Sequence, residues 1–175
     1  MARASLEGLH RRPGFMIRRA HQIAVSVFVE ETAELGITTT QYGILYALAR
    51  RPQIDQISVA RLLGLDRSTT GMVLKTLEDG GLVHRIVDTS DRRKRSLELT
   101  PAGHELLERL KTPARRAVER LLAPLGAEER TTFLNLLDKL THAFNATSRV
   151  PLLDERAAPS PPSRDKQGRR GLAET

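Results

Sequence analysis

Two short stretches of this chain gather side chains that hydrogen-bond or carry positive charge. The first opens a predicted helix, and the second lies between two predicted strands. They consist of Arg67, Ser68, Thr69 and Thr70, and of Asp91, Arg92, Arg93, Lys94 and Arg95. Such side chains can contact base edges and phosphates of a nucleic acid. A helix start also presents free N–H groups and a positive dipole end, which favour phosphate binding.

Each stretch taken alone has a simpler interpretation. Hydroxyl residues after a helix cap often form only a solvated first turn, and a basic run is usually a solvated loop. The elements around the two stretches decide between these interpretations.

One short predicted helix precedes the first stretch, and the stretch itself begins a second. Ser58 stands at the N-cap of the first helix, and Gly64 ends it. Asp66 caps the second helix, which ends at Gly80 and Gly81. Helical spacing predicts that the second helix turns three apolar residues inward, namely Met72, Val73 and Leu77.

Residues 82–87 and 96–99 have strand composition and enclose the second stretch. A bracing helix, a helix with a polar front and a hairpin with a basic tip therefore follow one another. This order is typical of a winged helix-turn-helix, in which the second helix enters the major groove and the tip reaches the neighbouring backbone. The sequence therefore predicts sequence-specific binding to double-stranded DNA.

Long helices are predicted on both sides of this unit. One runs from Phe15 to about Leu35, and a capping box of Thr38 and Gln41 starts another that closes at Arg51-Pro52. Downstream, Thr100-Pro101 begins a helix to about residue 122, in which Pro113 predicts a kink or break.

A last predicted helix, at about 127–147, is unusually apolar. Its apolar residues are Phe133, Leu134, Leu136, Leu137, Leu140 and Phe144. This surface is too large for a terminal helix lying alone on a small DNA-binding unit. Pairing of the terminal helices across a twofold axis would bury it, and a homodimer would fit a palindromic operator.

Composition limits the partners and the chemistry. The 175 residues carry a net charge of +7, which favours a polyanionic partner. Only 3% are aromatic and none is Trp, which argues against base stacking on single strands. There is no cysteine, and the five histidines are scattered, so we expect no metal and no cofactor. No apolar run is long enough for a membrane span or secretion signal, which predicts a cytoplasmic protein.

An enzyme and a nonspecific architectural DNA-binding protein are the two alternative functions. An enzyme would need a nucleophile motif, a phosphate-binding loop or a metal motif, and the sequence contains none of them. A nonspecific architectural DNA-binding protein without a ligand is the stronger alternative, because charge alone would suffice for it. Equal binding to random and specific duplexes at moderate salt would favour that alternative.

The motifs LDRSTTGMVLKTLEDGGLVHR and DTSDRRKRSLELTPAG resemble the MarR family of bacterial transcriptional regulators, and the likeness extends over about residues 13–150. The resemblance implies a mainly α fold with a small β-hairpin. It also implies a homodimer held by N- and C-terminal helices, and repression relieved by small anionic or phenolic ligands. We expect a flexible start at 1–12, a single domain at 13–150 and a disordered tail at 151–175. Within the domain, the winged unit takes about 38–100, and the dimerisation helices take about 14–35 and 101–148.

The resemblance also assigns positions. Arg67, Ser68, Thr69, Thr70 and Lys75 match the recognition helix, and Ser58 matches the start of the bracing helix, as a phosphate contact. Asp91, Arg92 and Arg93 match the wing, whose tip also carries Lys94 and Arg95. The absence of cysteine and of a histidine-rich set departs from the redox-sensing and zinc-sensing members.

The segment GFMIRRAHQIAVSVFVEE is similar to members that regulate the breakdown of aromatic acids, including nicotinate. It indicates a pocket for a small aromatic carboxylate, formed by Arg18, His21, Gln22 and Tyr42. Arginine can bind a carboxylate through two hydrogen bonds, and tyrosine supplies an apolar wall with a polar tip. The alternative is that Arg18 is a surface charge and His21 an interface residue.

Overall fold

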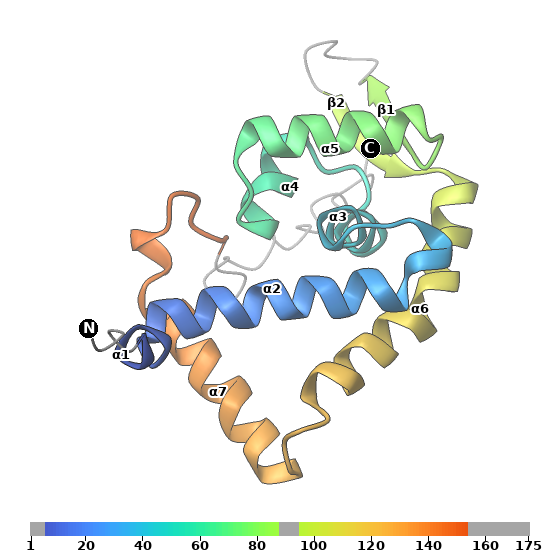
Figure 1. Cartoon of the computed structure of the whole chain (residues 1–175). Helices are drawn as coiled ribbons and strands as arrows, with labels where there is room; N and C mark the ends of the chain where they lie inside the picture. The colour runs from blue at the N-terminus through green and yellow to red at the C-terminus, as the bar shows by residue number, and fades with distance from the viewer. Residues whose placement is uncertain (1–5, 88–94, 154–175) are drawn as a thin grey trace, which may run out of the picture.

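The computed structural model describes residues 6–87 and 95–153. Within them the chain forms a helical protein with one hairpin (Figure 1). The elements are α1 (Glu7–His10), α2 (Pro13–Glu31), η1 (Ala33–Leu35), α3 (Thr39–Arg50), α4 (Gln56–Leu63), α5 (Arg67–Asp79), β1 (Val83–Val87), β2 (Arg95–Leu99), α6 (Pro101–Leu122), α7 (Ala127–Ala143) and η2 (Asn145–Thr147). The mainly α fold with a small hairpin, predicted from the sequence, is confirmed.

The elements divide into a head and a frame of long helices. In Figure 1, α2, α6 and α7 outline a triangle, and α3, α4, α5 and the hairpin lie on the other side of α2 from α7. The core of the head is formed by Ile44, Leu45, Leu48, Val59, Leu74, Leu77 and Leu110, together with hairpin residues. A smaller cluster of Phe28, Ala114 and Ala117 joins α2 to α6.

Local capping explains several helix starts. At α3, the Gln41 N–H donates to Thr38 Oγ1 at 3.2 Å, and the Thr38 N–H donates to Gln41 Oε1 at 2.9 Å. At α6, the Gly103 N–H donates to Thr100 Oγ1 at 3.1 Å, and Pro101 occupies the first helical position. Both predicted starts are therefore confirmed.

The start of α4 differs from the prediction, because the N-cap is Asp55 rather than Ser58. Asp55 Oδ1 accepts from the N–H groups of Ile57 and Ser58 at 2.7 and 2.9 Å. The Ser58 hydroxyl donates to Asp55 Oδ2 at 2.8 Å. Burial raises the pKa of Asp55, but these hydrogen bonds from Ser58 and Ile57 more than offset it and lower the pKa overall. A carboxylate caps here because it accepts all three hydrogen bonds at once.

The hairpin is anchored to the head at its base. Its strands are antiparallel, and the register pairs Val83 with Leu99 and Arg85 with Leu97. The Leu97 N–H donates to the Ile54 carbonyl at 2.9 Å, so the loop before α4 extends the hairpin by one bridge. This bridge holds the wing beside the start of α4.

The sequence predicts a kink or a break at Pro113, and helix α6 is continuous from Pro101 to Leu122, so no break occurs there. Proline removes the hydrogen bond to the carbonyl four residues earlier, that of Arg109. Both Arg109 and Pro113 line a polar depression at the end of α2, while Leu110 and Ala114 are buried beside them. Tertiary packing of Leu110 and Ala114 therefore supports the helix beside the missing hydrogen bond.

Both ends of the described ranges make contacts with the helices next to them. Residues 7–10 form a helical turn, and the His10 ring lies 5.0 Å from the Phe15 ring. At the other end, the Leu152 N–H donates to Asn145 Oδ1 at 2.9 Å, and the Leu153 N–H donates to the Arg61 carbonyl at 3.2 Å. Residues 7–10 and 152–153 therefore contact neighbouring helices, and the predicted domain bounds remain a prediction.

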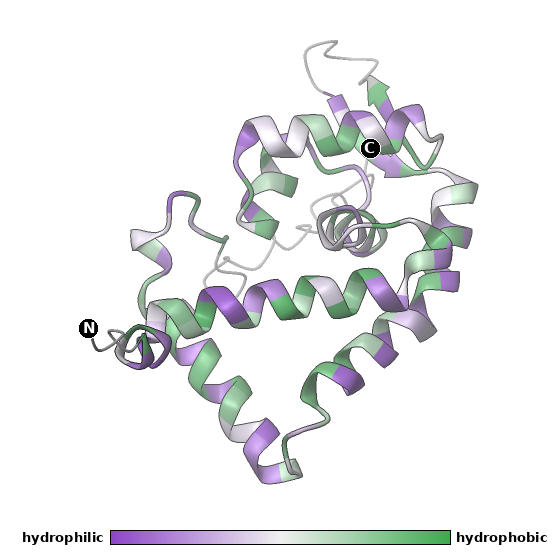
Figure 2. Cartoon of the chain, in the orientation of Figure 1, coloured by the Kyte–Doolittle hydropathy of each residue, from purple (hydrophilic) through white to green (hydrophobic). Residues whose placement is uncertain are grey.

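Figure 2 shows hydrophobic residues recurring along α2 and α7. Many of them are exposed in the single chain, including Ile17, Ile23, Leu134, Leu136 and Leu140. No helix of the described ranges is both long and apolar enough to cross a membrane.

Candidate DNA-binding surface and apolar pocket

Helix α5 begins on the carboxylate of Asp66. The Thr69 N–H donates to Oδ1 at 2.9 Å, and the Thr69 hydroxyl donates to Oδ2 at 2.6 Å. These hydrogen bonds from Thr69 lower the pKa of Asp66 below its ordinary value. The ionised carboxylate therefore fixes the first turn of α5 at neutral pH.

One face of α5 is open to solvent and bears the predicted polar residues. Arg67, Ser68 and Lys75 are exposed and share a shallow depression of about 630 Å³ with Gln56, Gly71 and Met72. Residues at this spacing lie along a single side of a helix. The face therefore offers cations, a hydroxyl and an amide to one ligand.

Two predictions about α5 are wrong. Thr70, predicted among the DNA contacts, is 0% exposed, and its hydroxyl donates to the Asp66 carbonyl at 2.9 Å. Met72, predicted to face inward, is 63% exposed. Leu74 takes the inward position instead and is fully buried. Leu77, which was also predicted to face inward, is 1% exposed. A shift in helical phase, set by how α5 packs on α3 and α4, accounts for both differences.

A basic groove lies between the starts of α4 and α5 and the hairpin. It encloses about 760 Å³, and its cationic lining residues are Arg67, Arg85 and Arg95. Ser58 also lines it. Arg85 Nε donates to Glu78 Oε1 at 2.7 Å, and Arg85 Nη1 donates to Gln56 Oε1 at 3.4 Å. Arg85 therefore connects the hairpin with both helices.

Of the predicted basic wing tip, the described residues include Arg95. Arg95 begins β2 and is exposed. Asp91, Arg92, Arg93 and Lys94 lie outside the described residues. The contacts predicted for these four remain predictions.

A largely apolar pocket of about 540 Å³ opens where α2, α3 and α6 meet. It is lined by His21, Ala24, Val25 and Phe28 of α2, Thr39 and Tyr42 of α3, and Lys111, Ala114, Arg115, Ala117, Val118 and Leu121 of α6. The Phe28 and Tyr42 rings lie 5.3 Å apart, and burial raises the pKa of Tyr42. The pocket therefore combines aromatic walls with polar groups from three helices.

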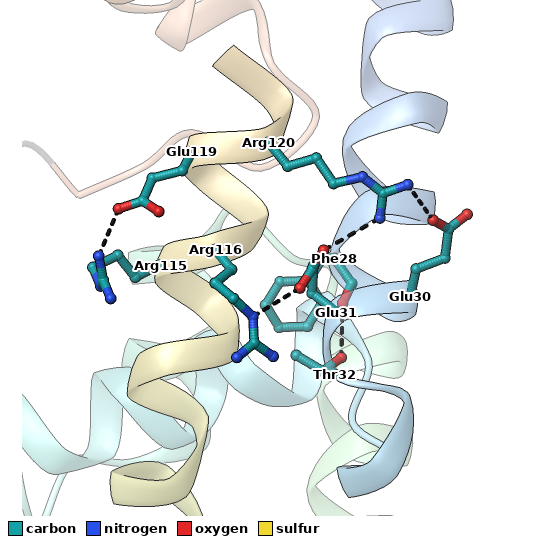
Figure 3. A network of polar contacts seen from close by, with 8 residues as sticks. All are labelled: Phe28, Glu30, Glu31, Thr32, Arg115, Arg116, Glu119 and Arg120. Atoms are coloured by element: carbon teal, nitrogen blue, oxygen red, sulfur yellow. Dashed lines mark hydrogen bonds and ion pairs between the residues drawn. The ribbon is translucent and has the colours of Figure 1, made fainter. Parts of the chain in front are cut away.

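An ion-pair network joins α2 to α6 beside this pocket (Figure 3). Arg116 Nε donates to Glu31 Oε2 at 3.0 Å, and Arg120 reaches Glu31 at 3.3 Å and Glu30 at 2.7 Å. The hydrogen bond from Arg116 is the main reason why the pKa of Glu31 is lowered. Figure 3 also shows Arg115, a lining residue, paired with Glu119 at 2.7 Å. The network ties the end of α2 to the helix that forms the opposite wall.

The comparisons with known proteins agree with this geometry. A family model described as "MarR family" matches residues 35–94, which include α3, α4, α5 and strand β1. The chain is 34% identical over 128 residues to a putative transcriptional regulatory protein for the hcr operon of Thauera aromatica, covering 73% of this chain and 77% of that protein. The chain belongs to the MarR family. It is therefore a DNA-binding transcriptional regulator, as predicted from the sequence.

Two solved structures of the same fold concern proteins with a known DNA or small-molecule partner. The repressor CouR bound to a 23-mer DNA duplex has a TM-score of 0.73 and 30% identity, with 78% of this chain and 97% of that chain covered. BpsR of Bordetella bronchiseptica, described as regulated in DNA binding by 6-hydroxynicotinic acid, has a TM-score of 0.71 and 27% identity, with 75% and 94% covered.

In this MarR-family chain the predicted ligand residues divide into two pairs. His21 and Tyr42 line the pocket, and their contact with a ligand remains a prediction. Arg18 and Gln22 do not line it. The Arg18 guanidinium lies 5.0 Å above the Phe15 ring, and the backbone carbonyl of Gln22 accepts a hydrogen bond from the Ser26 hydroxyl. Side chains within one turn of α2 point in different directions, so their closeness in sequence does not bring the four predicted residues together.

Several residues of these MarR-family surfaces were missed by sequence reasoning. Lys111 and Arg115 bring positive charge to the pocket, whereas Gln56 and Arg85 line the depressions beside α5. The four-residue spacing of Lys111 and Arg115 indicated a shared helical face. Nothing in the sequence indicated that this face would meet His21, because α2 and α6 are about ninety residues apart.

Proposed function

We propose that the chain is a homodimeric repressor that binds a palindromic operator and leaves it when a small aromatic carboxylate binds. The observation that carries this proposal is the position of the pocket. Its walls come from α3, which belongs to the head, and from α2 and α6, which belong to the frame. A ligand in this place touches both units and can change the angle between them.

The DNA-binding half of the proposal rests on the exposed face of α5. Arg67, Ser68 and Lys75 would contact DNA in the major groove, while Arg85 and Arg95 lie in the groove beside them. Arg92, Arg93 and Lys94 would reach the neighbouring backbone, and Asp91 would brace an arginine of the wing. Ser58 would contribute at the start of α4. A protein of the same fold has been solved on a DNA duplex.

The ligand half rests on the chemistry of the pocket. Its apolar lining and the rings of Phe28 and Tyr42 suit a flat aromatic ring. Lys111 and Arg115 can pair with a carboxylate, because their partners Glu108 and Glu119 hold them only through exposed ion pairs. His21 can hydrogen-bond a ring substituent. The regulation of BpsR by 6-hydroxynicotinic acid supports this ligand class.

The proposal of a homodimer rests on the exposed apolar side chains of α2 and α7 described above. Unpartnered surface of this kind marks an interaction site. A second copy would cover it and would place two α5 helices on one side of a palindromic duplex, about one helical turn apart.

Arg67→Ala is expected to weaken operator binding by about 1–3 kcal/mol and binding to random DNA by less. The guanidinium of Arg67 lies on the open face of α5, and alanine is compatible with its helical position. Operator and random duplexes would be titrated at the same salt concentration. Lys139→Ala, which removes one positive charge from α7, serves as the control. Equal losses on both duplexes would instead support the architectural alternative.

His21→Ala and Lys111→Ala are expected to stay on the operator when 6-hydroxynicotinic acid is added, with DNA affinity in its absence unchanged. A tenfold release requires only about 1.4 kcal/mol of coupling, so the loss of one contact can abolish it. Release would be followed by fluorescence anisotropy, and binding by the rise in melting temperature.

Arg18→Ala is the matched comparison, since Arg18 lies outside the pocket lining and should leave the response intact. The amide of the same acid tests the need for negative charge. A normal response in both His21→Ala and Lys111→Ala would place the ligand elsewhere.

A further inference from the structure

Helix α5 carries an exposed apolar side chain in the middle of its polar face. Met72 is 63% exposed, whereas Leu74 and Leu77 of the same helix are buried. It lines the same depression as Arg67, Ser68 and Lys75. The exposed Met72 side chain is therefore available to a partner that docks on this face of α5.

The residue before Met72 has no side chain, and the Gln56 amide lies against it. A Cβ placed at Gly71 would lie 3.2 Å from Gln56 Nε2. Gln56 and Met72 line the same depression. Met72 therefore projects from the open face of α5 beside this amide, and its long and flexible side chain can reach into a groove.

The major groove offers one apolar group for such a side chain, the 5-methyl of thymine. We propose that Met72 packs on a thymine methyl in each half-site and makes the operator prefer thymine at that base pair. The proposal rests on the proposed docking of α5 in the major groove. Lys75 supplies attraction to the duplex, and Met72 adds discrimination at one position to that supplied by Arg67.

The test uses an operator that the full-length protein selects from random duplexes. Each thymine in it is replaced in turn, in both half-sites, by deoxyuridine, which lacks only the methyl. At one symmetric position we expect binding by the wild-type protein to weaken about fourfold per methyl, or about fifteenfold for the two. The Met72→Ala variant should bind the thymine and deoxyuridine duplexes equally well, and Met72→Leu should keep the preference.

Lys75→Ala separates this effect from a general loss of affinity. It removes a charge from the same face, so it should weaken binding to both duplexes by the same factor and leave their ratio unchanged. The melting temperature of Met72→Ala should equal that of the wild type, because the replaced side chain is exposed and alanine favours a helix.

The outcomes distinguish this inference from the function on which it rests. If the wild-type protein selects an operator but no deoxyuridine replacement weakens binding, the role of Met72 is overturned and the DNA-binding proposal stands. The same holds if Met72→Ala keeps the thymine preference. If the protein selects no operator at all, both proposals fail.

Discussion

Replacing Leu136 with glutamate and Leu140 with lysine is expected to produce a folded monomer that has lost its operator affinity. The two side chains are 60% and 42% exposed in the single chain, so the change removes apolar surface without opening a core. The new charges lie four residues apart, which supports helix α7. Two linked heads bind a palindrome far more tightly than one, so we expect operator binding to weaken at least about a hundredfold.

Sedimentation at micromolar concentration would report the oligomeric state, and circular dichroism would report the helix content. Asn135→Glu is the matched control, because it pairs with the native Lys139 at the same spacing on the other side of α7. It should remain a dimer and bind DNA normally. A double variant that still sediments as a dimer would rule out this interface.

The Gly103→Ala variant should be strongly destabilised. Gly103 lies in the first turn of α6, and a Cβ there would lie 2.1 Å from the Leu82 carbonyl oxygen and 3.1 Å from its carbon. That carbonyl is held in place, since it accepts from the Thr100 N–H at 3.0 Å. One of the two segments must therefore move. We expect the free energy of unfolding to fall by about 3 kcal/mol, which corresponds to a melting temperature about 10 °C lower.

Thermal and urea unfolding of the purified variant would measure this loss. Gly14→Ala is the control, because Gly14 also lies near a helix start but a Cβ there meets nothing within 4 Å. We expect that control to match the wild type or to gain up to about 1 kcal/mol, since alanine favours a helix more than glycine does. A Gly103→Ala protein as stable as the wild type would show that the contact with Leu82 relaxes at little cost.

The helix boundaries were largely predictable because they depend on neighbouring residues. The capping box of Thr38 and Gln41, the Thr100-Pro101 start and the turn at Gly64 each act within a few residues. The N-cap of α4 was assigned to Ser58 and lies at Asp55. Both residue types suit an N-cap, and Asp55 caps the helix because its carboxylate can accept more hydrogen bonds than a hydroxyl.

From the sequence we could therefore predict the order of the elements, the winged helix-turn-helix and the cationic stretches that indicate DNA. These properties follow from short-range capping, periodicity and charge. The rotation of α5, which buries Thr70 and exposes Met72, depends on tertiary packing. The same packing brings His21 and Lys111 into the lining of one pocket and leaves Arg18 outside it. Such choices depend on how helices distant in sequence pack side by side, and local patterns do not encode that packing.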